Sequence, residues 1–90
     1  MKVTYETEIP TMCPEDGEGD IYRVSFESWR AILVEDIKTA IEDATSGPYR
    51  DPPQRPRFQE EMTDFLSRRL TCKVTSIGYH SGVKTTVTCP

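Results

Sequence analysis

The stretch CKVTSIGYHSGVKTTVTC, residues 72–89, decides the fold. Apolar and polar residues alternate on both sides of Ser81-Gly82, and this two-residue period is typical of half-buried strands. A serine–glycine pair between two such runs indicates a tight hairpin turn, because glycine tolerates the positive φ that the turn requires. We therefore predict two antiparallel strands, Cys72–His80 and Val83–Cys89.

Two helical segments precede this hairpin. Between Val34 and Ala44 the apolar residues recur at the spacing of one helix face, and Ser46-Gly47-Pro48 ends this helix. Four prolines between residues 48 and 56 indicate an extended connector. The second helix follows it, with an apolar stripe predicted to face the core. The stripe contains Phe58, Met62, Phe65, Leu66 and Leu70.

The N-terminal part contains another pair of strands. Val3–Ile9 and Ile21–Ser28 both alternate, and Pro10–Gly19 is predicted as the loop between them. The order is then ββααββ, an α+β domain with a four-stranded antiparallel sheet and two helices on one face. Such a sheet leaves its second face and two edges open to water. Pairing of edge strands between subunits would close the sheets into a barrel-like ring with helices outside.

The composition indicates a small soluble domain. The chain has 90 residues, enough for a single domain (1–90) with a thin core. No apolar stretch approaches the ~20 residues that span a bilayer, and the N-terminus lacks the order of a secretory signal. We therefore expect a cytoplasmic protein with no membrane partner. The net charge of −4 argues against a broad nucleic-acid interface, although a single base carried by a polynucleotide could still be a substrate.

The three cysteines, Cys13, Cys72 and Cys89, have no C-x-x-C spacing, so neither a disulfide framework nor a metal site is indicated. Cys72 and Cys89 are predicted to pack in the last hairpin, too far apart for a disulfide. The first hairpin would bring Cys13 and Asp20 to the same end of the sheet. A thiolate beside a carboxylic acid suits attack on a nitrile, whose nitrogen needs a proton as the sulfur adds to the carbon.

A simpler interpretation of the same residues is that Cys13 is a packed loop thiol and Asp20 shapes the turn. Glu60 raises a similar choice. At the start of the second helix its charge is favoured, and a carboxylate can accept two hydrogen bonds from the edge of a guanine-like base. Alternatively, Glu60 and Glu61 are solvated first-turn acids. His80, the single histidine, is predicted to be a solvated turn residue rather than a base or a ligand.

Three arginines lie in or at the end of the proline-rich connector: Arg50, Arg55 and Arg57. A basic cluster of this size is either solvated or in contact with a phosphate.

Two motifs resemble those of the QueF group of tunnelling-fold enzymes, and the similarity extends over nearly the whole chain. One is Thr11-Met12-Cys13-Pro14 with Gly17 and Asp20, in the pattern T-x-C-P-x-x-G-x-x-D; the other is Phe58-Gln59-Glu60-Glu61. The resemblance implies that Cys13 forms a thioimide with 7-cyano-7-deazaguanine and that Asp20 handles the proton. It also implies that Glu60 holds the deazapurine, together with Gln59, which stands where the group usually has a histidine.

The resemblance also bears on the second reactant. The nicotinamide-dependent reductases of the group carry an E-S-K-S-x-K type run after the second strand, whereas residues 34–39 here read VEDIKT. Only Glu35 and Lys38 correspond. A short QueF-like branch lacks that run and converts the nitrile in tRNA to an amidine with ammonia, and the chain is similar to it in length and helix sequence. An amidine-forming enzyme of queuosine- or archaeosine-type metabolism, without a cofactor, is therefore implied first, and an NADPH-dependent reductase second.

Members of the group form pentameric rings, often stacked as decamers, with the substrate between subunits, so the resemblance implies a homo-oligomer. The deazapurine could arrive as a free base, in tRNA or in DNA. Two other classes of protein stay open. One is a non-catalytic tunnelling-fold module that binds a purine or a pterin. The other is a structural or partner-binding protein in which Cys13 and Asp20 are turn residues.

Overall fold

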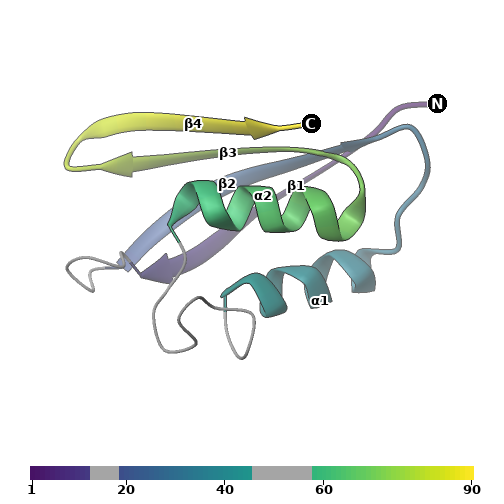
Figure 1. The fold of residues 1–90 in the computed structure, drawn as a ribbon, viewed down its shortest axis with the longest axis horizontal. Coiled ribbons are helices and arrows are strands. Elements are labelled where there is room, and N and C mark those ends of the chain that lie inside the picture. Colours follow the sequence, from purple (N-terminus) through teal and green to yellow (C-terminus); the bar gives the residue numbers. More distant parts are fainter. Residues whose placement is uncertain (13–18, 46–57) are drawn as a thin grey trace.

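A computed structural model describes residues 1–12, 19–45 and 58–90 of the chain. These residues form four strands and two helices in the predicted ββααββ order (Figure 1). The elements are β1 (Val3–Met12), β2 (Gly19–Ser28), α1 (Val34–Thr45), α2 (Gln59–Leu70), β3 (Lys73–His80) and β4 (Val83–Cys89). Neither helix of this described part is long and apolar enough to cross a membrane.

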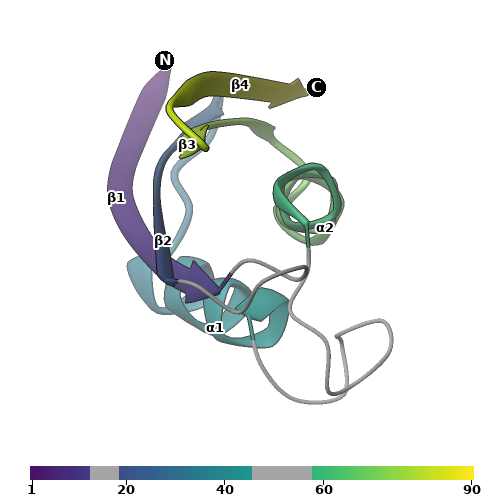
Figure 2. The same ribbon diagram turned by 90° about the vertical axis from the view of Figure 1, so that its left-hand side faces the viewer.

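The strands form one antiparallel sheet in the order β1-β2-β3-β4. Two hairpins, β1–β2 and β3–β4, are joined in the centre by the pairing of β2 with β3, so β1 and β4 are the edges. Figure 2 shows the sheet curving around α2, while α1 lies under β1 and β2. Both helices therefore cover the same face, as predicted.

The β1–β2 hairpin is longer than the sequence predicts. Its pairing continues to Thr11 with Asp20 and to Met12 with Gly19, so the loop predicted over Pro10–Gly19 is wrong at both ends. Pro10 lies within β1 although it has no N–H to give to a strand ladder. An edge strand tolerates this, because the groups on one of its sides are unpaired in any case.

The β3–β4 turn follows the prediction. Ser81 has a φ of 51° and Gly82 a φ of 81°. Positive φ at both central residues is characteristic of a type I′ turn, whose twist matches that of the flanking strands. The pairing then runs from His80 with Val83 at the turn to Val74 with Cys89.

The core lies between the sheet and the two helices. In β2 the predicted face is buried, with Tyr22, Val24 and Phe26 each almost inaccessible. The rest of the core consists of Ile9, Ile32, Ile37, Ala40, Ala44, Met62, Leu66, Leu70, Cys72 and Val74. Cys72 and Cys89 are free thiols, as predicted. Burial raises the pKa of the Cys72 thiol, against the opposing effect of the Arg30 charge.

The buried face of α2 is more polar than the apolar stripe predicts. Phe58 is not a core residue, because it precedes the first turn as the N-cap and is 36% exposed. Three polar residues spaced four apart are buried instead: Gln59, Thr63 and Ser67. Polar side chains can be buried when their hydrogen bonds are satisfied inside the protein. We call these three residues the polar line of α2.

Candidate functional site

The predicted site residues within the described part of the chain gather at one end of the molecule. Asp20 is near the start of β2, and Gln59 and Glu60 begin α2; this is the left-hand end of Figure 1, where the β3–β4 turn also lies. Cys13 is outside the described residues, as are Arg50, Arg55 and Arg57. Met12, which precedes Cys13 in the chain, pairs with Gly19 beside Asp20.

The Gln59 side chain joins α2 to both strands of the second hairpin. Its Nε2 donates to Ser76 O at 3.2 Å, to Ser76 Oγ at 3.0 Å and to Thr85 O at 3.1 Å. Two of these acceptors are backbone carbonyls, which can only accept. The amide orientation is therefore fixed, with the nitrogen toward the strands and Oε1 toward His80.

The hydroxyl groups of Thr63 and Ser76 form hydrogen bonds with Gln59 and with each other, and the donor of each bond can be assigned. Thr63 Oγ1 donates to the backbone oxygen of Gln59 at 2.7 Å and lies 2.6 Å from Ser76 Oγ. Because the Thr63 hydrogen is already used, the Ser76 hydroxyl donates to Thr63 and accepts from Gln59. All three side chains are buried, and such a satisfied buried network is rigid.

His80 is the outer end of this chain of hydrogen bonds. Its Nε2 lies 2.8 Å from Gln59 Oε1, and its Nδ1 lies 3.9 Å from Asp20 Oδ2. The His80 side chain is 38% exposed and that of Asp20 is 20% exposed. The Tyr22 ring packs beside His80, with 5.9 Å between the ring centroids. The interpretation of His80 as a solvated turn residue is therefore corrected.

The sequence contains a signal that His80 lies on the buried face of β3. Residues 74, 76, 78 and 80 alternate with outward-facing positions of β3, so His80 shares a face with the buried Val74 and Ser76. Gly78 belongs to the same face. A Cβ at Gly78 would overlap the Tyr22 ring and lie 3.5 Å from Gln59 Oε1. Glycine is therefore what lets the Tyr22 ring lie against β3 next to His80.

The two acids at the start of α2 have different roles. Glu61 Oε1 accepts a hydrogen bond from the backbone N–H of Phe58 at 3.3 Å, which caps the helix. Glu60 is exposed, and its carboxylate makes no hydrogen bond or ion pair with another described residue. An exposed first-turn acid agrees equally with a solvated surface residue and with a base-binding carboxylate, so the base-binding role of Glu60 stays a prediction. Direct substrate contact by Gln59 stays a prediction, and its amide is already bonded within the protein.

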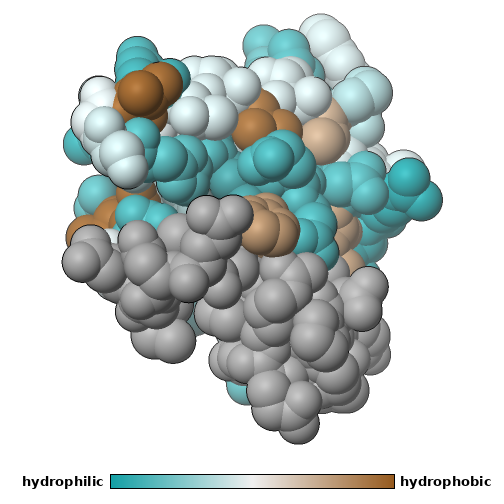
Figure 3. Space-filling model, turned by 60° about the vertical axis from the view of Figure 1, so that its left-hand side comes forward, coloured by the Kyte–Doolittle hydropathy of each residue, from teal (hydrophilic) through white to brown (hydrophobic). Residues whose placement is uncertain are grey.

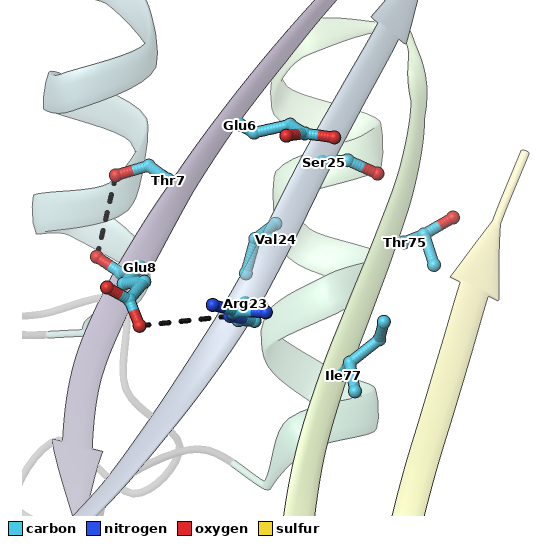
Figure 4. A pocket seen from close by; sticks show the side chains of 8 residues that line it. All are labelled: Glu6, Thr7, Glu8, Arg23, Val24, Ser25, Thr75 and Ile77. Carbon is cyan, nitrogen blue, oxygen red and sulfur yellow. Dashed lines mark hydrogen bonds and ion pairs between the residues drawn. The ribbon is translucent and has the colours of Figure 1, made fainter.

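A shallow hollow lies on the opposite, helix-free face of the sheet (Figure 4). Glu8 and Arg23 line it and form an exposed ion pair of 4.0 Å. The full lining is Glu6, Thr7, Glu8, Arg23, Val24, Ser25, Thr75 and Ile77. Because strand residues alternate between faces, this hollow is separated from the Asp20–His80 pair by the sheet.

The surface at the Asp20–His80 end is mixed. Hydrophilic residues dominate the described surface in Figure 3, with hydrophobic residues between them. At this end, exposed apolar or aromatic side chains belong to Ile21, Tyr79 and Val83. Within the ranges that the structure describes, no group of three or more His, Cys, Asp or Glu side chains could hold a metal ion.

Comparison with known proteins identifies one solved structure with this fold, described as the archaeosine synthase QueF-Like in the apo form. The TM-score is 0.72 at 23% sequence identity, and the alignment covers 98% of this chain and 90% of the other. No protein-family model and no curated protein matches the chain. The likeness confirms the tunnelling fold of the single subunit. The barrel-like ring stays a prediction.

Proposed function

We propose that this protein is an enzyme of 7-deazaguanine metabolism in which Cys13 attacks the nitrile of a 7-cyano-7-deazaguanine and ammonia resolves the product to an amidine. One observation carries the proposal. The β1–β2 hairpin places Asp20 at the same end of the molecule as the exposed carboxylate of Glu60, and β1 ends there at the residue before Cys13. The fold shared with an archaeosine synthase supports this substrate class.

The first step needs a nucleophile and an acid. The Cys13 thiolate forms a bond to the nitrile carbon while one carbon–nitrogen π bond breaks, and the nitrogen takes a proton from Asp20. The product is a thioimide, and no group leaves. Asp20 is assigned the acid role because its Oδ2 lies 3.9 Å from Nδ1 of His80, a second group that can carry the proton.

Substrate binding is assigned to Glu60. An ionised carboxylate can accept two parallel hydrogen bonds, which matches the adjacent N–H and NH₂ groups of a guanine-like base. The first turn of α2 favours this charge, because the backbone N–H groups of a helix start point toward it. Glu61 is occupied by the helix cap, which leaves Glu60 for the ligand.

Charge on α1 favours ammonia over NADPH as the second reactant. The first turn of α1 carries Glu35 and Asp36, and its last turn has no basic residue. Acidic side chains at a helix start repel the phosphates of a nicotinamide cofactor instead of binding them. Lys38 is a single positive charge in this region. The NADPH-dependent reductase is therefore the second candidate.

Intact-mass spectrometry tests the proposed first step. We expect the wild-type protein, mixed with 7-cyano-7-deazaguanine, to gain the whole mass of the substrate, because addition to a nitrile releases nothing. Cys13→Ala should gain no mass, whereas Cys89→Ala should react like the wild type. If the adduct disappears with ammonia and persists with NADPH, the amidine-forming reaction is supported; the reverse result would support the reductase.

The proposed roles of Asp20 and Glu60 are tested separately, that of Asp20 by the rate of adduct formation and that of Glu60 by the affinity for the substrate. Asp20→Asn should slow adduct formation, since an amide cannot supply the proton. Glu60→Ala should weaken substrate binding by about 2–5 kcal/mol, through the loss of charge-assisted hydrogen bonds that the bound base shields from water. Glu35→Ala, which removes a first-turn acid of α1, is the matched control and should bind normally. Normal affinity in Glu60→Ala would exclude the assigned role of Glu60.

Two further tests concern the form of the substrate and the assembly. Adduct formation should be compared for the free base and for the same base carried in tRNA or in DNA, and the fastest reaction identifies the natural form of the substrate.

A homo-oligomer, pentameric or decameric, is expected in sedimentation, because two sheet edges and one sheet face lack a cover within the described chain. A non-catalytic purine- or pterin-binding module would instead bind its ligand equally well after Cys13→Ala.

A further inference from the structure

We infer that His80 is a positioning residue that stores a proton for Asp20 and returns it during attack on the nitrile. The inference rests on the proposed function. It is drawn from the direction of the hydrogen bonds between α2 and His80, and from the position of the Asp20 carboxylate 3.9 Å from the other ring nitrogen of His80.

The network determines which imidazole nitrogen carries the fixed hydrogen. Gln59 Oε1 can only accept, because the Gln59 nitrogen is held by Ser76 and Thr85. His80 Nε2, 2.8 Å away, must therefore carry a hydrogen and donate it. In neutral His80 the other nitrogen, Nδ1, then has a free lone pair. Nδ1 is therefore the ring nitrogen whose lone pair faces outward from the network.

Nδ1 faces a carboxylate. Asp20 Oδ2 is 3.9 Å from it, longer than a direct hydrogen bond, so a small rotation of either side chain or one bridging water connects the two atoms. From the other described elements, α2 presents the neutral Gln59 amide to His80 and β2 presents the Tyr22 ring. Asp20 is therefore the acid that pairs with His80 in the described structure, and the two can share one proton.

The proton shared by Asp20 and His80 accounts for the one that the nitrile nitrogen receives in the first step. The Cys13 thiol gives its hydrogen to the Asp20–His80 pair, which leaves a thiolate on Cys13 and one proton on the pair. Sulfur bonds to the nitrile carbon, one carbon–nitrogen π bond breaks, and the nitrogen takes that proton from Asp20. The pair returns to a carboxylate and a neutral imidazole. No oxidant, reductant or other reactant is consumed.

The test uses His80→Gln, which keeps an N–H donor for Gln59 Oε1 but has no atom that can bind a proton near neutral pH. We expect the rate constant of adduct formation at saturating 7-cyano-7-deazaguanine to fall about 10- to 100-fold, within the range for lost proton transfer. The substrate concentration for half-maximal rate should change less than about twofold. Lys84→Gln, at the same end of the sheet, is the control and should react at the wild-type rate.

A double variant separates proton transfer from a general structural effect. If His80 acts through Asp20, then adding His80→Gln to Asp20→Asn should slow the reaction no further, whereas independent roles would multiply the two losses. ¹⁵N NMR of the imidazole should show neutral His80 with its hydrogen on Nε2.

The outcomes are distinguishable. A wild-type protein that forms no adduct overturns the proposed function, and this role of His80 with it. A wild-type rate in His80→Gln, multiplied losses in the double variant, or a neutral Nδ1–H form each overturns the role of His80 and leaves the proposed function standing.

Discussion

The two halves of the polar line of α2 are bonded in different ways. In the C-terminal half, Ser67 Oγ lies 2.9 Å from Cys72 O and 2.7 Å from Pro90 O, so its bonds end on backbone carbonyls. In the N-terminal half, the bonds pass through Gln59 to the imidazole of His80, whose other ring nitrogen faces the Asp20 carboxylate at 3.9 Å. Burial of polar side chains is common to both halves. A chemical role is indicated only where the chain of bonds ends at ionisable groups.

Replacing Gln59 with Leu should have the largest effect on stability. The change removes the donor to the Ser76 hydroxyl and to the Ser76 and Thr85 carbonyls, and the acceptor of the His80 N–H, next to the buried Ser76 and Thr63 side chains. We expect the free energy of unfolding, measured by urea denaturation, to fall by about 2–5 kcal/mol, since each unsatisfied buried group costs about 1–3 kcal/mol. A loss below about 1 kcal/mol would mean that water replaces the amide and that the network is not rigid.

Gly78→Ala should come second. The new Cβ would overlap the Tyr22 ring, so the ring and its neighbour His80 must move. We expect a loss of about 1–3 kcal/mol in unfolding free energy, typical of overpacking, together with slower adduct formation. Gly19→Ala is the matched control, because nothing lies within 4 Å of a Cβ added there. Equal effects at the two glycines would contradict the packing described for Tyr22.

Ser67→Ala directly tests the difference between the N-terminal and C-terminal halves of the polar line of α2. Removing its hydroxyl takes one donor from the Cys72 and Pro90 carbonyls, and the expected loss of stability is about 1 kcal/mol. The rate of adduct formation should stay within about twofold of the wild type, because no ionisable group depends on Ser67. A rate as low as that of His80→Gln would show that the two halves are not distinct.

The smallest effect is expected at the other end of β2. Glu27 lies beside Lys2 and Lys73, and the hydrogen bond from Lys2 lowers the pKa of its carboxyl below 4.5. A lowered pKa in the folded state stabilises the protein above pH 4.5 and loses this contribution as the pH falls through the folded value. The wild type should therefore unfold at higher urea than Glu27→Gln at neutral pH, with the difference vanishing in acid. A difference that grew in acid would contradict the ion pairs.

Periodicity in the sequence was sufficient to predict the arrangement of elements. The alternation in β2 and the Ser81-Gly82 turn are local signals, and the structure confirms both. The length of the first hairpin was missed, since a proline suggests a loop but is tolerated in an edge strand such as β1. Hydrophobicity alone predicts that Phe58 lies in the core, but the buried face of α2 is set by the polar residues that hydrogen-bond there.

The site was predicted less completely than the fold. The motif spacing selected Asp20 and Glu60, which the structure places at one end of the molecule, while Cys13 is outside the described residues. The nearness of His80 to the turn predicts a solvated side chain, whereas its register in β3 places it on the same face as the buried Val74 and Ser76. Its bond to Gln59 joins residues 21 positions apart, and no local pattern in the sequence reveals such a contact.

The most direct test of the central claim is mass spectrometry with peptide mapping after mixing the wild-type protein with 7-cyano-7-deazaguanine. We expect a gain equal to the mass of the whole substrate, located on the peptide that contains Cys13 and absent in Cys13→Ala. No gain with the free base or with the same base in tRNA or DNA would contradict the claim. A gain located on Cys72 or Cys89 would contradict it as well.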